Sequence, residues 1–337
     1  MVQQQNIRYQ AWILVAGTLL LAGKFAAYFL TQSNAILSDA LESIVNVSAG
    51  AFALFSLVYA ARPEDENHPY GHGKIEFISA SIEGALIVLA GMGIVVKAGY
   101  NLIHPQELQR LDLGIWITAG AGAVNYLLGY LAEQRGNRVD SMALRASGKH
   151  LKSDAWTSLG LLGGIALVYL TGVVWLDNVL ALGFGGYILW IGVGILRQSL
   201  AGIMDEADYQ LIKRIVKILN QHRHENWVDI HKLRTIKFGS RLHIDSHLTL
   251  PWYLSVQEAH DEVDAIQEVI NEAFGKQVEM FVHVDPCLPS SCPICTKADC
   301  PQRKAEFQKR IEWRMRNLMA DARHGLDPET PISSTYS

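Results

Sequence analysis

Cysteine is absent from the first 286 residues of this 337-residue chain, and all four cysteines fall between Cys287 and Cys300. Disulfide bonds therefore cannot hold the larger part of the chain together. Charge is also scarce, because only 18% of the residues are charged. Basic residues are not in excess, since 29 Lys and Arg stand against 33 Asp and Glu. This balance argues against a protein that binds nucleic acid through its phosphates.

The chain also lacks the sequence features of several enzyme classes. It contains no pairing of a nucleophile with a base, no phosphate-binding loop and no cofactor fingerprint, so we do not expect an enzyme. We also expect no cleavable signal peptide. The first apolar run begins near Ala11 after a short polar start, and it is too long for the apolar region of a signal.

Long apolar runs are what this sequence has in abundance. Half of its residues are hydrophobic, and the mean hydropathy is +0.13. Six runs have about the length of roughly 20 residues that a helix needs to cross the hydrocarbon core of a bilayer. They lie near residues 10–31, 34–60, 77–102, 112–133, 147–171 and 174–198. We therefore predict an α-helical membrane protein with six transmembrane helices.

Basic residues gather in the connection between the fourth and fifth runs: Arg135, Arg138, Arg145, Lys149 and Lys152. Loops with such an excess of Lys and Arg stay in the cytoplasm. The sequence therefore predicts that this connection, the loop between the second and third runs, and both termini are cytoplasmic.

The pattern changes after residue 205 to short helices and strands. Helices are expected over Leu211–Gln221 and Val256–Phe274, and strands over Val228–Phe238, Leu242–Leu250 and Val278–Val284. This order is typical of a small α+β domain of ferredoxin-like type. We predict a transmembrane domain over 1–205 and an α+β domain over 206–286. Residues 287–337 are expected to form a Cys-rich knuckle, a basic helix over Lys304–Met319 and a disordered end.

Two apolar runs carry polar residues at helical spacing. His150 and Asp154 are four residues apart at the start of the fifth run, and Asp39, Glu42 and Asn46 share one face of the second. Such residues can form hydrogen bonds between helices, and a carboxylate can extend to water. Alternatively, Glu42, Asn46, His150 and Asp154 supply four ligands for a divalent ion. Ionisable groups inside a membrane are costly and usually functional.

The loop after the second run contains a compact group of Asp65, His68 and His72. Two His within five residues can arise by chance in a solvated loop. However, the neighbouring Pro69 and glycines permit a tight turn that brings potential ligands together.

The four cysteines, Cys287, Cys292, Cys295 and Cys300, lie within 14 residues. This spacing favours a thiolate knuckle that binds a structural Zn(II), with an iron–sulfur cluster as a weaker alternative. Disulfide bonds are a further alternative, which a reducing cytoplasm disfavours. The knuckle could sense metal, deliver it, or hold the end of the chain in place.

Several of these motifs together resemble the cation diffusion facilitators, a family of proton-coupled transporters of zinc and other divalent metals. They are HPYGHGKIE, KHLKSD, SDAL, HKLRT and HVDPC, and the resemblance covers about residues 10–286. It implies six transmembrane helices, a cytoplasmic metallochaperone-like domain and a homodimer. It also implies transport by alternating access, with metal exchanged for protons.

The resemblance also assigns site residues. The transport site would be Glu42, Asn46, His150 and Asp154, and a loop site would be Asp65, His68 and His72. Two bridged metals at the dimer interface would be held by His231, His247, His260, His283 and Asp285. The alternative for this last group is that they are ordinary interface histidines.

The chain departs from the family pattern in the second run. Zinc-transporting members have Asp or His at the first position and Asp at the second, whereas this chain has Glu42 and Asn46. This change favours some tolerance of harder ions such as Fe(II), Mn(II) or Co(II). Zn(II) remains the first choice, because His150 and the later histidines suit it. The expected function is proton-coupled efflux of divalent metal across a bacterial cytoplasmic membrane. The alternative is a membrane metal sensor or scaffold that does not transport.

Overall fold

The computed structural model describes residues 2–31, 34–104, 112–173, 175–239, 241–275 and 278–326. The chain divides into two compact units, Met1–Met204 and Asp205–Ser337. Each unit has its own buried hydrophobic core. The end of the chain that was expected to be disordered, from residue 327 onward, lies outside the described residues.

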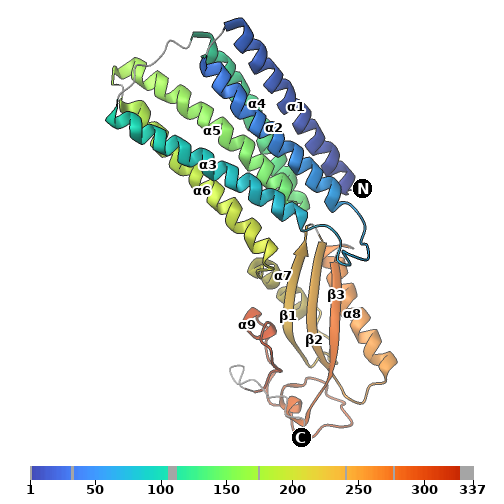
Figure 1. Ribbon diagram of the computed structural model, residues 1–337. Coiled ribbons are helices and arrows are strands. Elements are labelled where there is room, and N and C mark those ends of the chain that lie inside the picture. Colours follow the sequence, from blue (N-terminus) through green and yellow to red (C-terminus); the bar gives the residue numbers. More distant parts are fainter. Residues whose placement is uncertain are drawn as a thin grey trace. The chain divides into compact units, whose positions relative to one another are not determined.

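The first unit consists of long helices that run alongside one another (Figure 1). They are α1 (Val2–Thr31), α2 (Asn34–Ala60), α3 (Ile75–Ile103), α4 (Asp112–Val139), α5 (Met142–Thr171) and α6 (Trp175–Ile203). All six expected helices are thus present. The helix α5 begins five residues before the expected span, so its polar beginning is helical as well.

Four helices in the described part of the chain are long and apolar enough to cross a membrane: α1, α2, α3 and α6. The helices α4 and α5 are less apolar along their length than α3 and α6. In α5 the reason is its first half, which carries Arg145, Lys149, Lys152 and Asp154. Two of the predicted transport-site residues, His150 and Asp154, lie in this charged first half of α5.

Small residues let α5 approach α4 closely. A Cβ atom at Gly148 would lie 2.5 Å from the backbone nitrogen of Glu133, and one at Gly129 would lie 2.7 Å from the carbonyl oxygen of Gly148. Larger residues at these positions would push the two helices apart. Lys152 Nζ also forms an ion pair with Glu133 at 2.9 Å. Together these contacts hold α5 against α4 and set its orientation.

The second unit is a small α+β fold. It contains α7 (Tyr209–Gln221), β1 (Asp229–Phe238), β2 (Arg241–Leu250), α8 (Val256–Phe274) and β3 (Val278–Pro286). The strands form one sheet in the order β1-β2-β3, with β1 antiparallel and β3 parallel to β2. Apolar residues from one face of the sheet pack with residues of α7 and α8 in a single core. The predicted αββαβ order is confirmed.

The predicted basic helix over Lys304–Met319 is wrong. Only α9 (Met315–Leu318) is helical there, after a short 3-10 helix, η1 (Pro289–Ile294), earlier in the chain. Residues before α9 use their backbone groups in distant contacts instead. The amides of Gln308 and Lys309 donate to the carbonyl of Pro293, and Arg223 Nη1 donates to the carbonyl of Ile311. Tertiary packing has therefore overridden the helical spacing of the apolar residues.

Candidate metal-binding sites

Three predicted ligands meet between α2 and α5. The side-chain amide of Asn46 donates from Nδ2 to Asp154 Oδ2 at 2.7 Å. Its oxygen, Oδ1, lies 3.0 Å from Nε2 of His150. His150 Nε2 and Asp154 Oδ2 are 3.9 Å apart, and their side chains are 9% and 19% exposed. The amide of Asn46 thus bridges a histidine and a carboxylate in a largely dehydrated place.

These distances are close to what a metal ion requires. Tetrahedral ligands about 2.0–2.2 Å from an ion lie roughly 3.3–3.6 Å from one another. The two distances from His150 Nε2, 3.0 and 3.9 Å, fall on either side of that range. Small rotations of the side chains would therefore suit an ion. The side chain of Glu42, the predicted fourth ligand, lies outside the part of the structure that is described.

A cavity of about 40 Å³ adjoins this group. Its lining includes Asn46 and His150, together with Lys24 of α1 and Glu83 of α3. Since a buried water needs roughly 10–15 Å³, the cavity has room for about three waters or a partly dehydrated ion. The cavity therefore connects residues from five helices, α1 to α5, with Asn125 contributed by α4.

Glu83 and Lys24 were missed by the sequence analysis. Glu83 is 2% exposed, and among the described residues neither of its carboxylate oxygens has a hydrogen-bond partner. Lys24 is 7% exposed and donates from Nζ to Ser43 Oγ at 2.8 Å. The available signal was an ionisable residue within an apolar run, which is rare unless it has a function.

The loop group forms around a turn after α2. Asp65 Oδ1 lies 2.9 Å from Nδ1 of His68, and its Oδ2 lies 3.3 Å from Nε2 of His72. Asp65 also accepts the amide of His68 at 2.7 Å, which closes the turn, and Gly71 has a φ of +78°. Hydrogen bonding with His68 lowers the pKa of Asp65. The structure thus brings all three predicted residues together as one candidate site.

The register of the sheet assembles a third group, which lies in the second unit. His231 of β1 pairs with His247 of β2, and His247 pairs with His283 of β3. The three rings therefore lie side by side across the strands. Asp285, two residues after His283, points to the same face. We call these four residues, His231, His247, His283 and Asp285, the histidine cluster.

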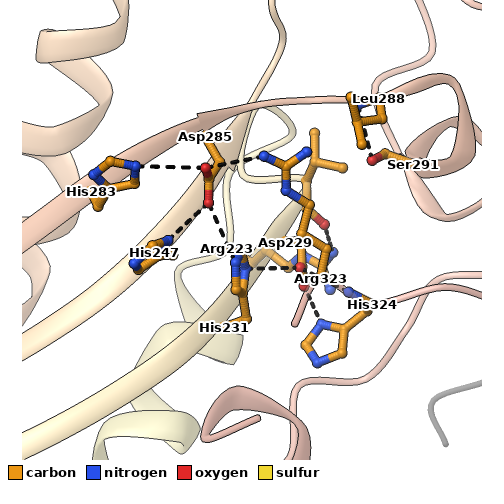
Figure 2. Close-up of polar contacts among 11 residues, drawn as sticks. Arg223, Asp229, His231, His247, His283, Asp285, Leu288, Ser291, Arg323 and His324 are labelled. Carbon is orange, nitrogen blue, oxygen red and sulfur yellow. Dashed lines mark hydrogen bonds and ion pairs between the residues drawn. The ribbon is translucent and has the colours of Figure 1, made fainter. Parts of the chain in front are cut away.

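Asp285 is the point on which the histidine cluster converges (Figure 2). Its Oδ2 lies 3.0 Å from His247 Nδ1 and 3.4 Å from His231 Nε2. Its Oδ1 lies 3.7 Å from Nε2 of His283, which is more exposed than the others. His231, His247 and Asp285 form a group whose ligand atoms all lie within 4.8 Å. The predicted ligand His260 lies apart from them, exposed on α8 and 3.8 Å from Asp264.

Three further residues around the cluster were not found from the sequence. Asp229 Oδ2 lies 3.2 Å from Nδ1 of His231, so it can orient that ring for a metal at Nε2. His324 forms a close ion pair with the other oxygen of Asp229. Arg323 Nη2 lies 3.1 Å from Oδ1 of Asp285. The spacing of Asp229 and His231 on one strand could have indicated Asp229. No sequence pattern indicated Arg323 or His324.

The electrostatics of the histidine cluster favour the protonation states in which its residues bind metal. Burial lowers the pKa of His247, and the neighbouring His231 and His283 lower it further. A neutral imidazole is the form that binds metal. Burial would raise the pKa of Asp285, but hydrogen bonds from His247 and Arg323 outweigh it and lower that pKa. The carboxylate and the ring thus both prefer their metal-binding forms.

The four cysteines surround one cavity of about 70 Å³, which Tyr253 and Arg303 also line. All four are free thiols. Within this described segment, no three of their sulfur atoms lie within 4.8 Å of one another. Burial raises the pKa of Cys287 and of Cys295, and the nearby thiols raise both further. The four predicted thiols therefore line one cavity, but their sulfur atoms are too far apart to bind a single ion without moving.

The fold and these groups define an integral membrane protein with candidate metal ligands in both of its units. The model of the cation efflux transmembrane domain matches residues 10–204, and that of the cation efflux protein cytoplasmic domain matches residues 207–287. The chain therefore belongs to the cation efflux family, the cation diffusion facilitators, whose members transport metal cations.

Relatives of this chain have been named in several organisms. An uncharacterized transporter of Synechocystis sp. is 37% identical over 264 residues, which cover 78% of this chain and 84% of the relative. The cation-efflux pump FieF of Pectobacterium carotovorum is 27% identical and covers 78% of this chain and 87% of its own. The manganese efflux system protein MneS of Bacillus subtilis is 27% identical, with 82% and 94% covered.

Proposed function

We propose that this protein exports a divalent metal ion in exchange for protons, with Asn46, His150, Asp154 and Glu42 as the transport site. The observation that carries the proposal is the bridge by which Asn46 joins His150 to Asp154 between two helices of the apolar unit, beside a buried cavity. Metal and protons compete for the same histidine and carboxylate atoms, because ligands must be deprotonated to bind. A proton gradient can therefore drive metal release.

Zn(II) is the first choice for the transported ion, because imidazole and carboxylate together suit it. Fe(II), Mn(II) and Co(II) are further candidates, because the amide of Asn46 supplies a neutral oxygen, a ligand that harder ions accept. The likeness to a manganese efflux protein is compatible with this range. The basic α4–α5 connection supports an orientation in a bacterial cytoplasmic membrane with both termini in the cytoplasm.

Transport is tested by metal flux in proteoliposomes under an imposed pH gradient, with Zn(II), Fe(II) and Mn(II) supplied separately. His150→Ala and Asp154→Ala should each abolish flux while the protein remains folded. His104→Ala is a matched control, because His104 is exposed at the end of α3 and stacks on Tyr100. Flux at the wild-type level in either site variant, at equal protein amounts, would refute the assigned site.

We also propose that the cytoplasmic domain joins two copies of the chain through metal at the histidine cluster and at His260. Ligation shared by two chains favours association, because metal then binds the dimer more tightly than the monomer. Sedimentation of the full chain in detergent should show tighter association with Zn(II). The same experiment with His231→Ala should show no such change. Association that ignores Zn(II) in the wild type would contradict this role.

A sensor or scaffold that does not transport is the second candidate. The neutral Asn46 favours it, because the site then has one anionic ligand fewer than a site with Asp at that position. Such a protein would bind Zn(II) and change its association in detergent, yet it would carry no flux for any of the three ions. The flux and sedimentation experiments together therefore separate the two functions.

A further inference from the structure

We propose that Cys287, Cys292, Cys295 and Cys300 together bind one Zn(II) as a tetrathiolate site, separate from the transport site. The site lies at the limit of the family's cytoplasmic domain, which matches residues only as far as 287. Its metal would therefore belong to the part of the chain that follows this domain, and the proposal does not depend on transport.

The first support is the way the fold delivers the four thiols. Cys287 directly follows β3, while Cys292 and Cys295 lie at the end of η1. Cys300 follows after a turn, and all four line the same cavity. Sequence spacing alone could have spread these side chains over an irregular segment. Their convergence from three separate local structures is what a four-ligand site needs.

The second support is a backbone amide that donates to one of the sulfurs. The amide of Lys304 donates to Cys292 Sγ at 3.4 Å. Hydrogen bonds from amides stabilise a thiolate and orient its sulfur, as groups behind metal ligands commonly do. The sulfur of Cys292 thus has a donor that favours the metal-binding form.

The third support is the positive charge beside the site. Arg303 donates from Nη1 to the carbonyl of Cys292 at 3.1 Å and from Nη2 to that of Cys295 at 3.3 Å. The guanidinium thereby holds the knuckle in a fixed bend and lies next to the thiols. Four thiolates and one Zn(II) carry a net charge of −2, which Arg303 and the nearby Lys304 can offset.

Metal binding must also draw the sulfurs together. A Zn–S distance of about 2.3 Å places tetrahedral sulfurs roughly 3.8 Å apart, which is closer than any three of them lie here. The cavity of about 70 Å³ is the space into which they would move. Each thiol that is protonated beforehand releases its proton to solvent as its Zn–S bond forms.

The site would fasten the end of the chain to the cytoplasmic domain. The segment after Cys300 buries Ile311 and Trp313 in that domain, and then brings Arg323 and His324 to the histidine cluster. Closing the knuckle at the start of this segment restricts where the rest can go. Loss of the metal should therefore raise hydrogen exchange in residues 303–324 more than in β2.

The direct test counts Zn(II) per chain in the purified full-length protein after treatment with a mild chelator. Cys292→Ser with Cys295→Ser should lose one Zn(II) per chain. A matched control is Ser290→Ala with Ala298→Ser, since both residues are exposed in the same segment and outside the cavity lining. An unchanged Zn(II) count in the cysteine variant would overturn the proposal, as would bound iron with sulfide in the wild type.

A second measurement uses the wild-type chain and does not depend on a variant that folds. With Zn(II) bound and under reducing conditions, an alkylating reagent should modify none of the four thiols, and after stripping of the metal it should modify all four. Co(II) exchanged into the site should show sulfur-to-metal charge-transfer absorption. Equal alkylation with and without Zn(II), or the absence of that absorption, would overturn the assignment. Flux through the His150 site is measured separately, so failure here leaves the transport proposal intact.

Discussion

Replacing Arg323 by Gln removes a positive charge from the carboxylate on which the histidine cluster converges. Arg323 Nη2 lies 3.1 Å from Oδ1 of Asp285, and the two side chains are only 11% and 15% exposed. The other oxygen of Asp285 faces His231 and His247, where a metal would bind. Arg323 therefore competes with a metal ion for the same carboxylate. The variant should bind Zn(II) more tightly at this cluster.

The size of the effect follows from the geometry. A divalent ion on Oδ2 would lie roughly 5 Å from the guanidinium, and the two would repel by about 7 kcal/mol at an effective dielectric constant of about 20. Salt, and the freedom of Arg323 to turn away as metal binds, reduce this to about 2 kcal/mol, or roughly 30-fold in Kd. Gln keeps a donor for Asp285, which limits other changes.

The assay is a calorimetric Zn(II) titration of the full chain, in which the relevant binding event is the one that His231→Ala abolishes. Arg314→Gln is the control, because Arg314 lies in the same segment but is exposed and paired with Glu312. If Arg323→Gln left the affinity unchanged or weakened it, Arg323 would not compete with the metal. The segment that carries it would then serve the packing of the domain alone.

Three further changes test other parts of the molecule. Asn46→Asp adds a carboxylate beside His150, so metal affinity should rise, selectivity should move toward Zn(II), and the pH dependence of flux should change. If affinity, selectivity and pH dependence all stayed the same, Asn46 would not be a ligand of the transport site. Glu83→Gln removes a buried carboxyl group that lines the same cavity and that a nearby divalent ion would hold in its ionised form. Zn(II) affinity should therefore fall by about tenfold or more, whereas an unaltered affinity would make Glu83 structural. Burial lowers the pKa of His324, but its hydrogen bond with Asp229 and the charge of that carboxylate outweigh burial and raise the pKa above 6.5. The stabilisation by this pair is therefore complete below 6.5 and disappears as pH rises through the raised value. His324→Gln should therefore increase hydrogen exchange in β1 more at about pH 6 than at about pH 9, and equal effects at the two would contradict the pair's charge.

Local patterns were enough to predict most of the elements. The length of the apolar runs indicated the six long helices, since the thickness of a bilayer sets that length. Short apolar runs indicated the three strands, which the structure forms as β1, β2 and β3. The contact between His150 and Asp154 followed from their spacing of four on a helix. These features depend on residues that are near one another in the chain.

The helix expected over Lys304–Met319 shows where local reasoning stops. Its apolar residues have helical spacing, yet the carbonyl of Ile311 accepts a hydrogen bond from Arg223 and that of Trp313 accepts one from Asn220. The Trp313 ring also packs under the Arg223 guanidinium, 4.0 Å from its centre. A short helix is only marginally stable by itself in water, so contacts with distant residues determine whether it forms.

The sequence by itself therefore determined the membrane helices, the α+β order of the second unit and the residue types able to bind metal, because these rest on periodicity and side-chain chemistry. Only the tertiary structure decided which of those residues meet. Asn46 reaches Asp154 across 108 residues, and Arg323 joins Asp285 from just beyond the segment that was expected to be helical. Glu83 became a candidate functional residue only because the structure shows that it is buried beside the cavity. The sequence pattern could not show which helices pack around it. Contacts between distant residues depend on packing and strand register, which no local pattern contains.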